Sequence, residues 1–354
     1  MAMDADQLAG MFSAMDSKHI DNMGSARSFQ AIESMGVENA LSMGGENLAV
    51  MMHTMGADHM RSIDSQEMFE VAGAMEGEHF GNMDSTAAFA MFDTMGQEEA
   101  IGLEGEQLAG IFGAMEGDSI IDNISVDFLV NAADKMSFND FGVMDSDSAF
   151  GMFDAMGGAD VALISMEGDQ LAGMFAAMEG DQLASLGQDG LIEAFGTMGT
   201  DNVSTMGGDN LAEMFSAMGA TGLGQLDPTE LQDVAGAMLG SNMLELGPEA
   251  AIGMFETIGA NTVATDFTGD QLGGLIGALE PSQIGESLTP DVLLEAAGKM
   301  TIDHFHNVGG DQAAAMVETL GFDQVLELGG EQVAGMFSAM AGEQLESLGG
   351  DAVA

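Results

Sequence analysis

The sequence predicts an all-α fold, an α-solenoid (superhelix) of about seventeen 20-residue helix-turn-helix units. Three observations support this: a motif that recurs almost unchanged, a fixed spacing of apolar residues, and a repeat core built from good helix formers. The motif Gly168-Asp-Gln-Leu-Ala-Gly-Met-Phe-Ala-Ala-Met178 returns at Gly105 to Met115 and at Gly330 to Met340. We therefore expect one structural unit repeated along the chain.

The spacing is clearest in the last apolar residue of each predicted main helix. This residue recurs every 20 residues, with slips of only one or two, at Met15, Met35, Met55, Met75, Met95, Met115, Met136, Met156, Met178, Met198, Met218, Met238, Ile258, Leu279, Met300, Leu320 and Met340. Sustained self-similarity at a short period is typical of solenoids, in which each unit packs only on its neighbours.

Within one unit the apolar residues fall on one face of a helix. Leu8, Met11, Phe12 and Met15 follow the i, i+3, i+4, i+7 pattern, and Ile20 and Met23 lie three apart in a shorter second segment. Asp or Ser with Gly precedes most main helices, as expected of N-caps. Gly or Asp follows the second segment, at Gly24, Gly44, Asp64, Asp84, Gly187, Gly207, Gly247 and Gly329. Here glycine is expected to take the left-handed conformation.

A 20-residue period is also compatible with a leucine-rich repeat or a β-solenoid. Those folds need runs of β-branched residues or a ladder of Asn or Thr, whereas this repeat is rich in Gln, Leu, Ala, Met and Glu. A longer period lies above the short one, because residues 3–73 resemble residues 166–236. We therefore expect a first super-repeat of eight units at 1–165, a second at 166–328, and a truncated third copy at 329–354.

Composition limits the classes of partner. Five Lys and Arg stand against 59 Asp and Glu, a formal net charge of -54, which excludes nucleic acid and anionic membrane surfaces as direct partners. The apolar fraction of 46% is too high for a disordered chain. Cys is absent, no apolar stretch is long enough to span a membrane, and the first residues do not form a signal peptide. Both ends fall within the repeat pattern, which predicts a segment of a longer array.

The pair Asp169-Gln-Leu-Ala-Gly-Met-Phe-Ala-Ala-Met178 and Asp181-Gln-Leu-Ala-Ser-Leu186 resembles a known repeat. It is similar to the superhelical N-terminal domain of bacterial magnesium transporters and to the armadillo-like repeats of the flagellar motor switch. The resemblance implies a helical superhelix and, through the acidic surface, a response to magnesium. The sequence departs from the family in its many more repeats, in Met in place of Leu, and in lacking the transporter's membrane helices.

Carboxylates cluster at the predicted turns and helix starts. The candidate metal ligands are Asp4, Asp6, Glu104, Glu106, Asp145, Asp147, Glu167, Asp169, Glu179 and Asp181. One interpretation is a ladder of weak Ca²⁺ or Mg²⁺ sites, since hard cations prefer several oxygen ligands. The other is N-capping with favourable placement on the helix dipole, which we prefer for any single site. For the whole chain, charge repulsion favours a delocalised dependence on cations.

Other motifs add little chemistry. Met51, Met52, His53, Met55, His59 and Met60 could hold Cu(I), although the same stripe positions predict core, and His304 and His306 could chelate a transition metal. No nucleophile elbow or phosphate-binding loop occurs, so we do not expect an enzyme. We expect an elongated acidic scaffold in a surface or filamentous assembly, screened by divalent cations, with protein partners or self-association and no membrane insertion. An extracellular or cell-surface location is favoured over a cytoplasmic one. The alternative is an intracellular cation-sensing solenoid attached to a transporter or another partner.

Overall fold

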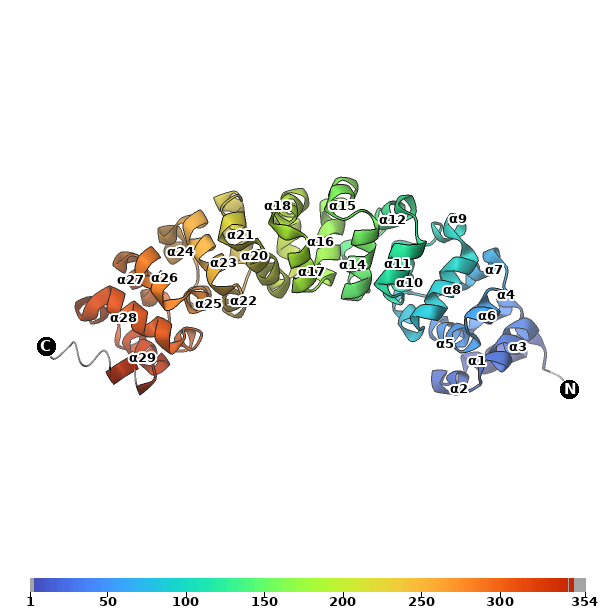
Figure 1. Ribbon diagram of the computed structural model, residues 1–354. Helices are drawn as coiled ribbons and strands as arrows, with labels where there is room; N and C mark the ends of the chain where they lie inside the picture. Colours follow the sequence, from blue (N-terminus) through green and yellow to red (C-terminus); the bar gives the residue numbers. More distant parts are fainter. Residues whose placement is uncertain (1–2, 343, 347–354) are drawn as a thin grey trace. The chain divides into compact units, whose positions relative to one another are not determined.

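The structure, a computed structural model, describes residues 3–342 and 344–346 (Figure 1). The described residues contain helices and no β-strand, and successive helices pack on one another, which confirms the predicted all-α repeat array. The chain forms two compact halves, Met1–Met178 and Glu179–Ala354, each described by itself below. Residues 347–354, which end the predicted third super-repeat, lie outside the described residues.

In the described residues, main helices alternate with short helices. The main helices of the N-terminal half are α1 (Ala5–Ser13), α3 (Ser25–Met35), α5 (Gly45–Met55), α7 (Ser65–Gly73), α8 (Ser85–Met95), α10 (Gly105–Gly113), α12 (Val126–Ala133), α14 (Ser146–Ala155) and α16 (Gly168–Ala177). The short helices between them are α2 (Ser17–Asp21), α4 (Val37–Ala40) with η1 (Leu41–Met43), α6 (Ala57–Met60), η2 (Gly77–Asn82), α9 (Gln97–Ala100), α11 (Gly117–Asn123), α13 (Phe138–Phe141) and α15 (Ala159–Ser165).

The C-terminal half continues the pattern. Its main helices are α18 (Gly187–Met198), α20 (Gly208–Leu223), α21 (Pro228–Gly236), α23 (Gly247–Met254), α25 (Gly269–Ala278), α27 (Pro290–Lys299), α28 (Gly310–Val325) and α29 (Gly330–Ala339). Its short helices are α17 (Gly180–Ser185), α19 (Thr200–Val203) with η3 (Ser204–Met206), α22 (Gly240–Glu245), α24 (Ala260–Asp266) after η4 (Phe255–Gly259), α26 (Pro281–Ser287) and η5 (His304–His306). In α20 and α28 the main and short segments join at Gly219 and Gly321, which have positive φ.

The apolar residue that closes each main helix forms the spine of the core. Of the seventeen apolar residues that recur about every 20 residues, all but Met15 are buried. In α10 the whole predicted stripe is buried, including Leu108, Ile111 and Phe112. The stripe prediction is only partly right for α1, where Met11 is 38% exposed. The reason is that α1 is the first helix of the described chain and has packing neighbours on one side only.

The glycines between repeats mostly have the predicted positive φ. Gly24 has φ 80°, and Gly44, Gly187, Gly207 and Gly247 also have positive values, so a side chain at these positions would be strained. At Gly24 and Gly44 the ψ value is near 150°, in a region that is essentially restricted to glycine. The prediction is wrong for Gly329, whose φ of -64° is open to any residue; it is the N-cap of α29.

The repeats interleave, which the sequence did not predict. The short helix of one repeat packs against the main helix two repeats later: α2 on α5, α11 on α14, and, in the C-terminal half, α22 on α25. Main helices of adjacent repeats also pack together, as α1 does with α3 and α18 with α20. Within each half, such a repeat therefore contacts the next repeat through its main helix and the second one after it through its short helix.

Paired glycines allow the short and main helices to cross closely. A Cβ atom on Gly110 would lie 2.4 Å from the Gly77 carbonyl oxygen, and one on Gly173 would lie 2.7 Å from the Phe138 Cα atom. Both distances are too short for a real Cβ atom, so these two positions require glycine. At Gly10, in contrast, no atom beyond its chain neighbours and its own helix backbone lies within 4 Å of a Cβ built there.

Candidate functional surface

All ten carboxylates predicted as cation ligands are exposed and lie at helix N-termini. Each pair contributes one N-cap residue and one residue of the first turn. The pairs begin α1 (Asp4, Asp6), α10 (Glu104, Glu106), α14 (Asp145, Asp147), α16 (Glu167, Asp169) and α17 (Glu179, Asp181). Negative charge at this end of a helix interacts favourably with the helix dipole. Asp4 and Asp145 cap their helices with side-chain hydrogen bonds, and the other eight lie at N-termini where the dipole favours negative charge. Cation binding by all ten stays a prediction.

The two kinds of N-cap residue use different hydrogen bonds. Asp caps accept from the backbone: Asp4 Oδ1 accepts from Gln7 N at 2.9 Å, and Asp145 Oδ1 accepts from Ser148 N at 2.8 Å. At Glu caps the hydrogen bond that is seen runs the other way, because the N-cap N–H donates to the side chain three residues later. Glu104 N donates to Gln107 Oε1 at 3.1 Å, for example. The Glu carboxylates at these positions thus remain at the surface.

The glutamine three residues after the N-cap also joins repeats. Gln107 Nε2 donates to the carbonyl oxygens of Gly73 at 2.9 Å and Met75 at 3.1 Å, at the end of the main helix two repeats earlier. Gln271 makes the same connection to Gly236 and Met238. A recurring Gln or Asn at this position was the available signal for interleaving, and sequence reasoning missed it.

The few basic side chains neutralise few carboxylates. Lys135 Nζ donates to the Ile101 and Leu103 carbonyl oxygens at 2.6 and 2.8 Å, and Lys299 Nζ bonds the carbonyl oxygens of Thr265 and Phe267. Arg61 forms ion pairs with Asp58 and Asp93. With five Lys and Arg for 59 Asp and Glu, most carboxylates have no basic partner within the chain.

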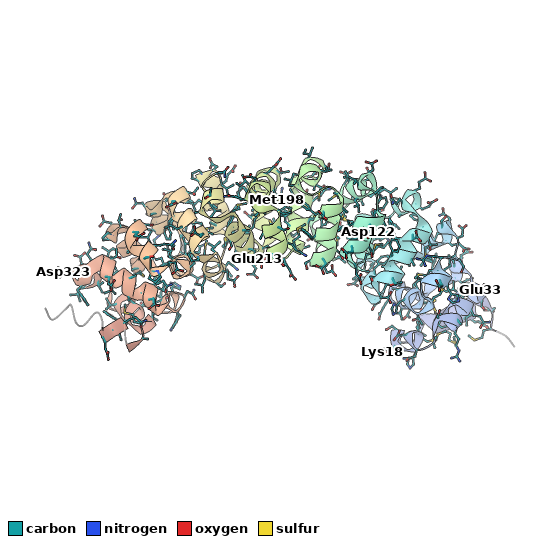
Figure 2. All side chains as sticks on the ribbon, in the orientation of Figure 1. Lys18, Glu33, Asp122, Met198, Glu213 and Asp323 are labelled. Carbon is teal, nitrogen blue, oxygen red and sulfur yellow. The ribbon has the colours of Figure 1, made fainter. Side chains whose placement is uncertain are left out.

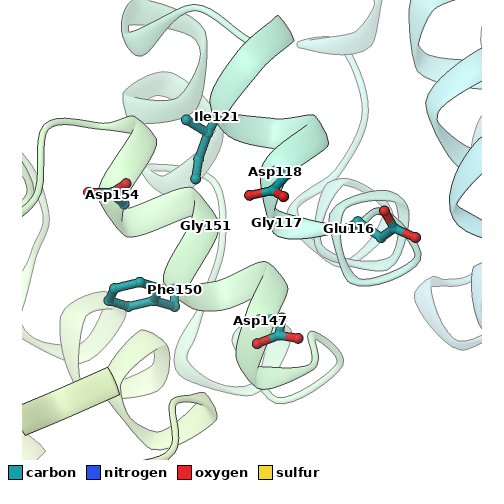
Figure 3. Close-up of a pocket in the computed structure, with 8 residues that line it drawn as sticks. All are labelled: Glu116, Gly117, Asp118, Ile121, Asp147, Phe150, Gly151 and Asp154. Atoms are coloured by element: carbon teal, nitrogen blue, oxygen red, sulfur yellow. The ribbon is translucent and has the colours of Figure 1, made fainter. Parts of the chain in front are cut away.

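An open groove of about 550 Å³ lies between α11 and α14 (Figure 3). It is lined by Glu116, Gly117, Asp118, Ile121, Asp147, Phe150, Gly151 and Asp154. Figure 3 shows the side chains of Asp118 and Ile121 extending from α11 beside α14. Ile121 is 40% exposed and Phe150 is partly exposed, so apolar and acidic groups are presented together. The described residues that line the groove include no Lys, Arg or His.

A second hollow of about 380 Å³ adjoins this groove and shares Glu116, Gly117 and Asp147 with it. Its lining adds the N-cap residues Asp84 and Asp145. Ser85 Oγ donates to Glu116 Oε1 at 3.2 Å. Two of the predicted cation ligands, Asp145 and Asp147, are therefore brought together with carboxylates of other repeats.

In the C-terminal half, Glu213 projects from α20 (Figure 2) into a groove of about 210 Å³ that Gly180, Ala184 and Glu245 help to line. Desolvation raises the pKa of the Glu213 carboxyl above its ordinary value, and the nearby charges of Asp209, Glu179, Glu245 and Asp181 raise it further. Two predicted ligands, Glu179 and Asp181, thus belong to an acidic cluster that spans α17, α20 and α22.

Several of the other metal candidates have structural roles. Met51, Met52, Met55 and Met60 are fully buried in the core. His304 Nδ1 accepts from Thr301 N at 3.1 Å. Among the described residues, ligand atoms of Glu76, Glu78 and His79 lie within 4.8 Å of one another, and there His79 Nδ1 accepts from Glu76 N at 2.9 Å. The two histidines thus occupy the capping position that Gln fills elsewhere.

Comparison with known proteins adds no family. No protein-family model matches the chain, and no curated protein matches it significantly. Within the described residues, no helix is both long enough and apolar enough to cross a membrane. Function must therefore be argued from the surface itself.

Proposed function

We propose that this protein is a non-enzymatic interaction scaffold, a helical repeat array whose acidic surface is screened by divalent cations and contacts basic proteins. The observation that carries the proposal is the placement of carboxylates at exposed helix N-termini in repeat after repeat, without matching basic groups. The apolar and amide side chains of the repeat serve packing and capping. The exposed carboxylates therefore form a regular, strongly negative surface that partners can contact. We place this scaffold in a cell-surface or filamentous assembly.

Charge density supports a role for cations. A net charge of -54 over seventeen repeats is about three negative charges per repeat, and neighbouring repeats lie within or near the Debye length of about 8 Å at physiological salt. Such repulsion opposes folding of the array unless cations accumulate. Ca²⁺ and Mg²⁺ accept carboxylate oxygens from separate chain segments, so they can bridge neighbouring repeats as well as screen them.

The test is thermal unfolding followed by circular dichroism, with light scattering to report assembly. Samples contain chelator, millimolar Ca²⁺ or Mg²⁺, or NaCl at matched ionic strength. We expect the unfolding temperature to rise more with divalent ions than with matched NaCl. If NaCl raises the unfolding temperature equally, the divalent ions act only by general charge screening. If neither salt raises the unfolding temperature, the proposal is contradicted.

The alternative is a cation-sensing regulatory solenoid attached to a partner inside the cell. The acidic cluster around Glu213 favours it, because several carboxylates from three helices converge there. A discrete change in a monomer over a narrow range of Mg²⁺ concentration would support this alternative. Ion-dependent assembly would support the scaffold.

A further inference from the structure

The groove between α11 and α14 arises from the same glycine crossing that joins the other repeats. A Cβ atom on Gly117 would lie 2.5 Å from the Asp147 carbonyl oxygen, and one on Gly151 would lie 2.5 Å from the Gly117 Cα atom. Neither helix therefore has a side chain at the crossing point. Residues three or four positions away, such as Ile121 and Asp154, flank the resulting hollow.

The three side chains that line this groove vary among the repeats. At the position of Ile121 the short helices η2 and α17 carry the small residues Gly81 and Ala184, whereas α22 carries Leu244. At the positions of Phe150 and Asp154 the residues are small in α10 (Ala109, Gly113), α16 (Ala172, Ala176) and α25 (Gly273, Gly277), whereas α8 has Phe89 and Asp93. The η2–α10 crossing therefore forms without any of the three side chains, whereas at the α11–α14 crossing all three line one groove.

A partner that covers the exposed apolar surface of Ile121 and Phe150 would gain about 25 cal/mol per Å² of apolar area removed from water. Ile121 stays 40% exposed although both helices that form the groove are packed in place. Glu116, Asp118, Asp147 and Asp154 surround the two apolar side chains. A ligand that fits must cover Ile121 and Phe150 and carry positive charge near these carboxylates. The carboxylates repel an anionic ligand, and a purely apolar ligand would remove them from water without supplying a counter-charge.

We propose that the α11–α14 groove docks a basic protein segment that presents an apolar side chain between Lys or Arg residues. Charge complementarity selects this occupant. A second copy of the chain has a net charge of -54 and is repelled by these carboxylates. Nucleic acid is also negatively charged and is repelled in the same way. The proposal rests on the scaffold function above and names the partner chemistry at one place on it.

The experiment measures binding of a fluorescent, amphipathic Lys/Leu peptide to the full chain by anisotropy, at physiological salt. A Lys-only peptide of equal charge is the comparison. Ile121→Ala with Phe150→Ala gives this groove small side chains like those of the η2–α10 crossing. The matched control, Val126→Ala with Ile164→Ala, trims two exposed apolar residues outside the groove. We expect about a tenfold loss of affinity for the groove variant, from the lost apolar contact, and less than about twofold for the control.

The charge contribution is tested by Asp118→Asn with Asp154→Asn. Its control is Asp122→Asn with Asp127→Asn, which makes the same change in net charge at exposed positions that do not line the groove. We expect a several-fold loss of affinity for the first pair only. Circular dichroism verifies that each variant remains helical.

Equal losses in groove and control variants, or equal binding of the Lys-only peptide, would overturn the docking proposal. Those results would mean that the peptide is held by delocalised charge. The divalent-ion experiment reports separately on the scaffold. Stabilisation by divalent ions without groove-specific binding would support the scaffold and contradict the docking site. Groove-specific binding without stabilisation by divalent ions would support the docking site and contradict the cation-screened scaffold.

Discussion

Glu213 occupies a position that is glycine in several other repeats. It is the sixth residue of its main helix, where Gly110, Gly173 and Gly274 allow a short helix to approach. A Cβ atom on Gly180 of α17 would lie 2.9 Å from the Glu213 carboxyl carbon. The carboxyl therefore lies beside the crossing, where desolvation, and after it the negative charges on α17, α20 and α22, raise its pKa.

This pKa gives a signed prediction for stability. The folded state raises the Glu213 pKa above its ordinary value of 4.5, so the folded state binds this proton more tightly than the unfolded state does. Stability is therefore lost as pH rises from about 4.5 through the raised pKa, and the loss is complete above it. We expect Glu213→Gln to raise the unfolding temperature at pH 7 and to leave it unchanged well below pH 4.5.

The effect is small, within about 1 kcal/mol, because Glu213 is exposed and solvent screens its charge. Glu256→Gln is the control, since it removes the same charge from an exposed position in the same half. Thermal unfolding of both variants across the pH range gives the comparison. An equal, pH-independent gain in the two variants would show that net charge, and not the local cluster, is responsible.

The sequence predicted which side chains are buried within a helix, but not which side chains connect non-adjacent repeats. The stripe of Leu108, Ile111 and Phe112 followed from helical spacing, because burial of one face is a local property of the sequence. The role of Gln271 did not follow. Its Nε2 atom bonds carbonyl oxygens 33 to 36 residues earlier, and this partner is fixed by the packing of non-adjacent repeats. The α11–α14 groove escaped prediction for the same reason.

At the scale of the helix, the glycine crossings hold the interleaved repeats together. The closest is between α22 and α25, where a Cβ atom on Gly274 would lie 1.9 Å from the Gly240 carbonyl oxygen. That atom belongs to the backbone, so the two helices must separate to accommodate even one methyl group. The cost is at the upper end of the range for overpacked sites, about 1–3 kcal/mol.

We expect Gly274→Ala to lower the midpoint of urea unfolding in the C-terminal half. The matched control is Gly236→Ala at the end of α21, where no atom beyond the chain neighbours and the helix's own backbone lies within 4 Å of the added Cβ. Ala has the higher helix propensity, so the control is neutral or stabilised by up to about 1 kcal/mol. If both substitutions stabilise the protein, the helices at this crossing are not in close contact.

At the scale of the whole chain, the 20-residue period predicted the number and type of elements, because each repeat encodes its own helices. The period alone did not specify which repeats touch. Contacts between a repeat and the second one after it depend on matched residues in both, such as Phe138 of α13 opposite Gly173 of α16. If the predicted eight-repeat super-repeat is the unit of duplication, a shift by eight repeats keeps this match, because Gly335 of α29 corresponds to Gly173, whereas some other shifts place a larger residue there, such as Ala315 of α28.

Two deletions test whether the super-repeat is the exchangeable unit. Removing residues 166–327 joins Ser165 to Leu328 and places Gly335 opposite Phe138, where Gly173 lies in the full chain. Removing residues 166–307 instead places Ala315 there, and its Cβ would overlap the Phe138 backbone. We expect the first protein to unfold at a higher temperature than the second, although it is one repeat shorter, with Ala315→Gly restoring part of the difference in the second. If the longer protein is the more stable without that substitution, repeats are interchangeable one at a time and the crossing residues do not set the register.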